Sequence, residues 1–128
     1  MDKHHMMQAE LLNYELGQIE QELQELDKKH EEVEQLRASL SDYETIETGK
    51  ELFVPLAPGI FTKAMSVPDK TLLVNVGQGV VVKREPEHVA EMLSGQLEQM
   101  EAHQKELQAL FEEKLATLQK METQCSDS

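Results

Sequence analysis

The chain has 128 residues and a formal net charge of -13, with 4% aromatic residues and no Trp. The length favours a single domain, and the scarcity of aromatic residues argues against a large globular core. The acidic balance argues against a nucleic-acid-binding protein, which needs clustered Lys and Arg, and against binding to an anionic membrane surface.

Targeting segments are not evident in the sequence. It contains no run of 18 apolar residues, which is about the length a transmembrane helix needs. The start, MDKHHMMQAELL, lacks the apolar region and cleavage site of a secretory signal. The single cysteine, Cys125, cannot form an internal disulfide, which favours a reducing compartment. We therefore expect a cytoplasmic protein that does not span a membrane.

The first predicted helix covers residues 5–47, and Thr48-Gly49 is a typical C-terminal stop. Two series of residues recur every seven positions and are offset by four, which is the seam of a coiled coil. Their members are Leu12, Ile19, Leu26, Val33 and Leu40 in one series, and Leu16, Leu23, His30 and Arg37 in the other.

The central segment, residues 51–85, is the only part rich in β-branched residues, Gly and Pro. Turn sequences divide it into four runs, at about 51–57, 60–67, 71–76 and 80–85, which predicts two β-hairpins. Pro55 cannot donate a ladder hydrogen bond, so its strand should be an edge strand or be interrupted there. Gly77-Gln78-Gly79 is better explained as a hairpin turn than as a nucleotide loop, because a third Gly and a following helix are missing.

The second predicted helix covers residues 86–123, and Pro86 suits its first position. It carries a matching seam of Leu93, Met100, Leu107, Lys114 and Met121, with Leu97, Gln104, Phe111 and Leu118. The fold class is therefore α+β: a long antiparallel coiled-coil hairpin with four strands inserted at its closed end.

The two seams can be aligned in antiparallel register without a slip. The alignment pairs Leu40 with Leu93, Val33 with Met100, Leu26 with Leu107, Ile19 with Lys114, Leu12 with Met121, Arg37 with Leu97, His30 with Gln104, Leu23 with Phe111 and Leu16 with Leu118. It places the polar residues His30 and Gln104 in one layer, where they would help to fix the register.

The predicted strands are apolar on more than one face, and a coiled coil two helices thick cannot cover them. Exposed sheet edges and apolar faces invite pairing with other chains. We therefore expect the chain to be an incomplete unit that assembles through its strands. The residues expected to carry oligomerisation are Phe61, Met65, Leu72, Val74, Val76, Val80, Val81 and Val82.

The segments KELFVPLAPGIFTKA and LVNVGQGVVVKR, lying between two heptad helices, resemble the archaeal-type α-class subunit of prefoldin. The resemblance implies one prefoldin-like domain over residues 1–128, with residues 51–85 as its oligomerisation region. It implies a hexamer with four β-class subunits for every two α-class subunits. It also implies an ATP-independent holdase that captures unfolded polypeptides at coiled-coil tips and delivers them to a group II chaperonin in the cytosol.

Apolar residues gather near the open end of the predicted coiled coil. Leu12, Leu16, Leu118 and Met121 can be explained as closing the seam. Four others lie off the seam and are the candidate client-binding residues: Met6, Met7, Leu11 and Leu115. Unbranched Met adapts to surfaces of many shapes, which suits a promiscuous binding site.

The remaining residues favour no catalytic, cofactor-binding or metal site. The histidines are scattered, apart from His4-His5, and no Cys and His spacing resembles a zinc site. Cys125 has no neighbouring base and is a poor candidate for a nucleophile. The acidic helix faces are explained by solvation, or by repulsion between coiled coils and attraction of basic clients. The rival to a chaperone subunit is a structural coiled-coil adaptor that binds one defined partner.

Overall fold

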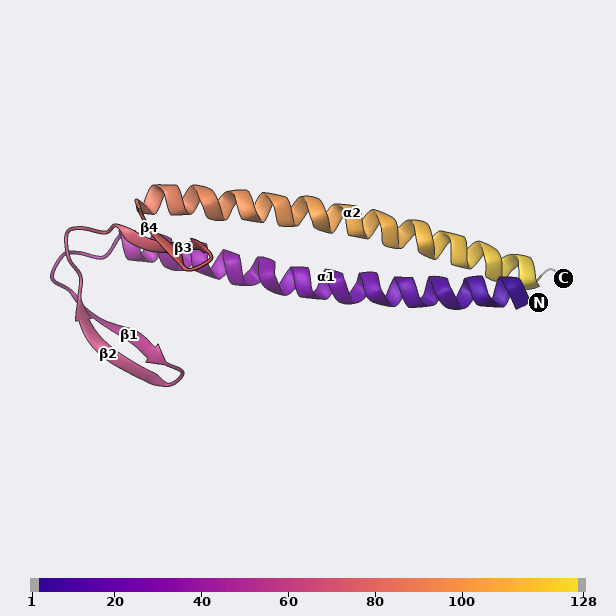
Figure 1. Ribbon diagram of the computed structural model, residues 1–128, viewed down its shortest axis with the longest axis horizontal. Coiled ribbons are helices and arrows are strands. Elements are labelled where there is room, and N and C mark those ends of the chain that lie inside the picture. Colours follow the sequence, from indigo (N-terminus) through magenta and orange to yellow (C-terminus); the bar gives the residue numbers. More distant parts are fainter. Residues whose placement is uncertain (1–2, 127–128) are drawn as a thin grey trace. The chain divides into compact units, whose positions relative to one another are not determined.

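The structure is a computed structural model that describes residues 3–126, with side chains described as far as Thr123 (Figure 1). The elements in chain order are α1 (Lys3–Glu44), β1 (Glu51–Ala57), β2 (Ile60–Met65), β3 (Leu72–Gly77), β4 (Val80–Arg84) and α2 (Pro86–Ser126). The chain divides into two compact units. One combines the described residues up to Glu32 with those from Gln96 onward, and the other is Val33–Gly95. The prediction about Cys125 lies outside the described side chains.

The predicted seam is present in the first unit, where every predicted seam residue with a described side chain is buried or half-buried. Its most buried members are Leu16, Ile19, Leu97, Leu107 and Leu118. In the second unit, Leu40 and Leu93 are buried, but Arg37 is exposed. The Arg37 guanidinium instead lies 2.9 Å from Glu34 on its own helix, because burying a charge without a partner is costly.

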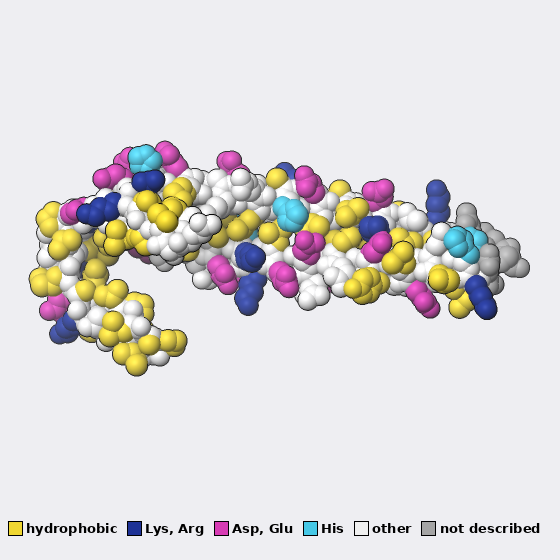
Figure 2. Space-filling model, in the orientation of Figure 1, with side chains coloured by type: hydrophobic (Ala, Val, Ile, Leu, Met, Phe, Trp, Pro, Cys, Tyr) yellow, Lys and Arg dark blue, Asp and Glu magenta, His cyan; other side chains and the backbone are white. Residues whose placement is uncertain are grey.

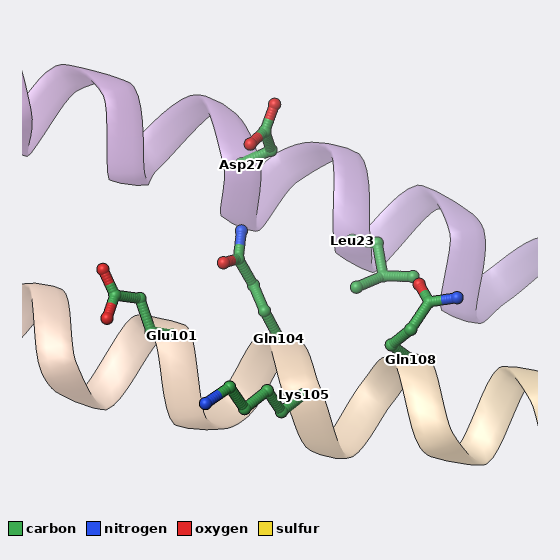
Figure 3. A pocket seen from close by; sticks show the side chains of 6 residues that line it. All are labelled: Leu23, Asp27, Glu101, Gln104, Lys105 and Gln108. Carbon is green, nitrogen blue, oxygen red and sulfur yellow. The ribbon is translucent and has the colours of Figure 1, made fainter.

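The predicted register of the two helices is wrong by about one helical turn. His30 does not face Gln104: its Nε2 lies 3.2 Å from Oε1 of Glu101. Figure 3 shows Gln104 extending toward the turn of α1 that carries Asp27, whose carboxylate points away, and Gln108 lying beside Leu23; these residues line an open groove. The side chain of Lys114 lies 2.6 Å from Glu15.

The helix geometry explains this correction. Along each seam, steps of four and three residues alternate. The predicted alignment set every four-residue step on α1 against a three-residue step on α2. The contacts of His30 with Glu101 and of Lys114 with Glu15 fit a register that matches steps of equal length. In the first unit, we infer that this register aligns Leu12 with Leu118, Leu16 with Lys114, Ile19 with Phe111, Leu23 with Leu107, Leu26 with Gln104 and His30 with Met100.

Both helix boundaries at the central segment have local causes. Helix α1 ends at Glu44, earlier than predicted, where the N–H groups of Thr45 and Ile46 bond to carbonyls three residues back at 3.2 and 3.3 Å. Such bonds tighten a last helical turn. Helix α2 begins at Pro86 as predicted, and the carbonyl of Glu85 accepts the first helical hydrogen bond, from Val89, at 3.2 Å.

The central segment forms two separate antiparallel two-stranded sheets, β1–β2 and β3–β4. The β1–β2 pairing shifts between Pro55 and Ala57, so the ladder is interrupted at the predicted place. The loop after β1 is Pro58-Gly59, in which Gly59 has a φ of 81°. Gln78 and Gly79 both have positive φ, at 52° and 76°, which is typical of the type I′ turn of a two-residue hairpin.

Candidate assembly strands and client-binding surface

The β1–β2 hairpin exposes most of its apolar side chains. Phe53 is 66% exposed, Leu56 71%, Phe61 61% and Met65 64%. Figure 2 shows hydrophobic side chains over much of this hairpin. Phe53, Phe61 and Met65 lie on one face, because Phe53 pairs with Lys63, Pro55 with Phe61, and Glu51 with Met65. This face therefore offers two aromatic rings beside Pro55, together with the charged residues Glu51 and Lys63.

The β3–β4 hairpin has two unequal faces. Leu72, Val74 and Val82 share one face and are half-buried, with Val74 directly opposite Val82. The other face carries Leu73, which is 70% exposed, and Val81, which is 53% exposed. One face of this hairpin is therefore partly covered within the single chain, and the other face is exposed.

The residues predicted for oligomerisation thus divide into two groups. Phe61, Met65, Val76, Val80 and Val81 are exposed, whereas Leu72, Val74 and Val82 are half-buried. The prediction omitted six exposed apolar residues of the same segment, which are Phe53, Val54, Leu56, Ile60, Val67 and Leu73. Strand alternation could have identified Leu73, since it lies on the same face as Val81, whereas Leu56 is displaced by the irregularity after Pro55.

The strand edges are open as well as the faces. Each sheet has only two strands, so one edge of every strand has no hydrogen-bonded neighbour within the described chain. Unpaired N–H and C=O groups along an edge form a template for another strand. A two-stranded hairpin is also marginally stable by itself. Both facts favour completion of the sheets by other chains.

The candidate client-binding residues lie in the first unit, and three of the four are exposed. Met6 is 47% exposed, Met7 69% and Leu11 57%. Leu115 is half-buried, so the expectation that it would be exposed is not met. Tyr14, 65% exposed, was missed. It follows Met7 and Leu11 at helical spacing, so these three residues form an apolar stripe on α1 away from the seam.

The described residues contain neither a metal-binding cluster nor a membrane-spanning helix. Between Lys3 and the last described side chains, no group of three or more His, Cys, Asp or Glu is arranged to hold a metal ion. Neither described helix is long and apolar enough to cross a membrane. The exposed strands and the apolar stripe therefore remain the features that suggest a function.

Comparison with known proteins identifies the family. The family model described as prefoldin subunit matches residues 12–127. Prefoldin subunit alpha of Archaeoglobus fulgidus is 26% identical over 113 residues, covering 88% of this chain and 82% of that protein. Prefoldin subunit alpha 1 of Methanocaldococcus jannaschii is 29% identical over 100 residues, covering 78% of this chain and 68% of that protein.

A solved structure shares the fold. The cryo-EM structure of filamentous PFD from Methanocaldococcus jannaschii matches with a TM-score of 0.69 and 20% identity, over 95% of each chain. This confirms the predicted α+β coiled-coil hairpin with inserted strands. Since the family model spans most of the sequence and the curated relatives are α subunits, the chain belongs to the prefoldin family as an α-class subunit of this molecular chaperone.

Proposed function

We propose that this subunit joins four β-class subunits and a second α-class subunit through residues 51–85. The resulting hexamer holds unfolded polypeptides in the cytoplasm without ATP and delivers them to a group II chaperonin. Membership of the family implies assembly with other prefoldin subunits. The composition of the hexamer, its clients and the chaperonin are part of the proposal. The chain's contribution is binding and involves no catalytic step.

The observation that carries the assembly proposal is the exposure of both hairpins in the single chain. Phe53, Phe61, Met65, Leu73 and Val81 are each more than half exposed. Burying apolar surface stabilises a complex by about 25 cal/mol per Å², so a fully buried side chain of this size contributes roughly 1.5–3 kcal/mol. Soluble monomers rarely leave large apolar patches uncovered.

The client proposal rests on the stripe formed by Met7, Leu11 and Tyr14, together with Met6. These side chains are exposed and are not needed to close the seam. An unfolded polypeptide offers apolar segments without a fixed shape, which flexible Met side chains can accommodate. Several coiled coils that each contribute weak contacts would hold a client by multivalency, without nucleotide hydrolysis.

Measuring the mass of the chain alone, and after mixing with a β-class subunit, tests the assembly. Val81→Asp should abolish the complex, because an unpaired charge would be buried in the interface. Val81 is a better target than half-buried Val74, whose substitution by Asp would also damage the hairpin itself. Leu36→Asp is the matched control, since Leu36 is 56% exposed on α1 and lies outside the strands. A hexamer that persists in Val81→Asp would refute assembly through this face.

Suppression of aggregation distinguishes the chaperone from the adaptor. The assembled complex should keep several unrelated, chemically denatured enzymes soluble after dilution, with no nucleotide present. A structural adaptor would protect none of them and would bind one defined partner.

A further inference from the structure

The end of α1 is held by a lysine from a distant loop. Lys70 lies between the two hairpins and is half-buried. Its Nζ donates a hydrogen bond of 2.8 Å to the carbonyl of Glu44 and another to the carbonyl of Ile46. The same ammonium group lies 5.9 Å from the centre of the Tyr43 ring. The side chain of Lys70 therefore contacts three groups at or just after the end of α1: the Tyr43 ring and the carbonyls of Glu44 and Ile46.

The C-terminal end of α1 needs hydrogen-bond donors and a positive charge from outside the helix. The last carbonyls of a helix have no partners within it, and its C-terminal end carries a partial negative charge. The last turn of α1 contains no basic residue. Lys70 supplies both the missing hydrogen-bond donors and the missing positive charge.

Ser66 makes a second connection, to the link between α1 and β1. It is 7% exposed, the one buried polar residue among those described. Its hydroxyl donates to the carbonyl of Glu47 and accepts from the N–H of Lys50 at 3.0 Å. Its backbone accepts from the N–H of Gly49 at 2.8 Å and donates to the carbonyl of Lys50 at 3.0 Å. The segment that leaves β2 is therefore bonded to the segment that enters β1.

We propose that Lys70 and Ser66 form a clamp that fixes the direction in which the β1–β2 hairpin leaves α1, and that assembly depends on this clamp. The inference rests on the proposed assembly through residues 51–85. The two residues are positioning residues, because they act through the backbone carbonyls of residues 44–47 and not through contact with a partner. Neither lies within a strand.

The clamp matters because the links on both sides of the hairpin are irregular. Residues 45–50 and 66–71 belong to no helix or strand, and Gly49 has a φ of 83°. Without the clamp, the hairpin would sample many directions about these links. An edge strand can pair only when it presents its edge in the right direction, so a clamp would reduce the entropy lost on assembly.

Spin-label distance measurements on the single chain test the clamp directly. Cysteines for the labels replace the exposed residues Leu36 on α1 and Leu56 on β1, in a Cys125→Ser background. We expect a narrow distance distribution in the parent chain and a broad one in Lys70→Met and Ser66→Ala. Lys70→Arg should restore a narrow distribution, because Arg keeps the charge and the donors. Lys29→Met is the control, since Lys29 is exposed on α1 and lies outside residues 51–85.

The same variants, without labels, are then mixed with a β-class subunit. Lys70→Met should weaken assembly by about tenfold through lost preorganisation, while its helical circular dichroism stays unchanged. A distribution as narrow in Lys70→Met and Ser66→Ala as in the parent would overturn the clamp. Broadening without weaker assembly would overturn its role in assembly. If the parent chain itself fails to assemble, the proposed function is wrong, and the distances still decide whether the clamp exists.

Discussion

The ion pair between Glu15 and Lys114 provides the most direct test of the observed helix register. Lys114 Nζ lies 2.6 Å from Glu15 Oε2, and the two side chains are 26% and 35% exposed, respectively. A charged hydrogen bond contributes about 1.5–3 kcal/mol when well shielded, and an exposed ion pair about 0–1 kcal/mol. Because solvent screens this pair in part, we expect a coupling free energy of roughly 1–2 kcal/mol.

A double-mutant cycle measures that coupling. The free energy of unfolding is determined by urea titration, followed by helical circular dichroism, for the parent, Glu15→Gln, Lys114→Met and the double variant. The exposed pair of Arg37 and Glu34, at 2.9 Å within one helix, is the control. Its coupling should be about 0.3–0.5 kcal/mol. A Glu15–Lys114 coupling no larger than this control would refute the register, because the alignment predicted from the sequence places Lys114 opposite Ile19.

Three further outcomes are expected. In a Cys125→Ser background, cysteines at Leu23 and Leu107 should cross-link within one chain on mild oxidation, whereas cysteines at Leu26 and Leu107 should not; the opposite yields, read on a denaturing gel, would restore the predicted register. Replacing Met6, Met7 and Leu11 by Ser should leave the assembly's mass and helicity intact but weaken suppression of aggregation, while Ser at the exposed residues Leu36, Met92 and Leu110 should not; equal activity of the two triple variants would exclude Met6, Met7 and Leu11 as client-binding residues. Ser66→Ala should lower the free energy of unfolding by about 1–3 kcal/mol, because it leaves the N–H of Lys50 and the carbonyl of Glu47 unpaired, and a urea midpoint equal to that of Thr45→Ala, which removes an exposed hydrogen bond, would contradict this.

The faces of the helices and the positions of the turns could be predicted because they are local properties. A seven-residue repeat determines which side of a helix is apolar, and burial follows it at Leu16, Leu97 and Leu118. Pro58-Gly59 and Gln78-Gly79 specify their turns through residues that favour the required φ. Arg37 departs from the pattern because a charged group at a seam position stays hydrated unless a partner is buried with it.

The exposure of the strand residues was predicted in outline only. Alternation along the strands showed that both faces are apolar, but not which face the single chain covers itself. For example, Val81 is exposed and Val82 is half-buried, although they are adjacent residues of the same type. The clamp could not be predicted at all, because Lys70 reaches the carbonyl of Glu44 across 26 residues of chain and no local pattern marks a lysine as a helix cap.

The prediction of the helix register failed for a different reason. The spacing of apolar residues constrains the rotation of a helix about its axis more strongly than its translation along that axis. A seam can slide and still place an apolar residue in most layers. Polar groups beside the seam discriminate between such alignments: the observed one brings Glu15 to Lys114 and His30 to Glu101. A slip of one turn would separate the first pair and leave the Lys114 ammonium, a seam residue only 26% exposed, without its carboxylate. Because a partly buried charge without a partner is costly, the Glu15–Lys114 pair favours the same register in which steps of equal length match along the two seams.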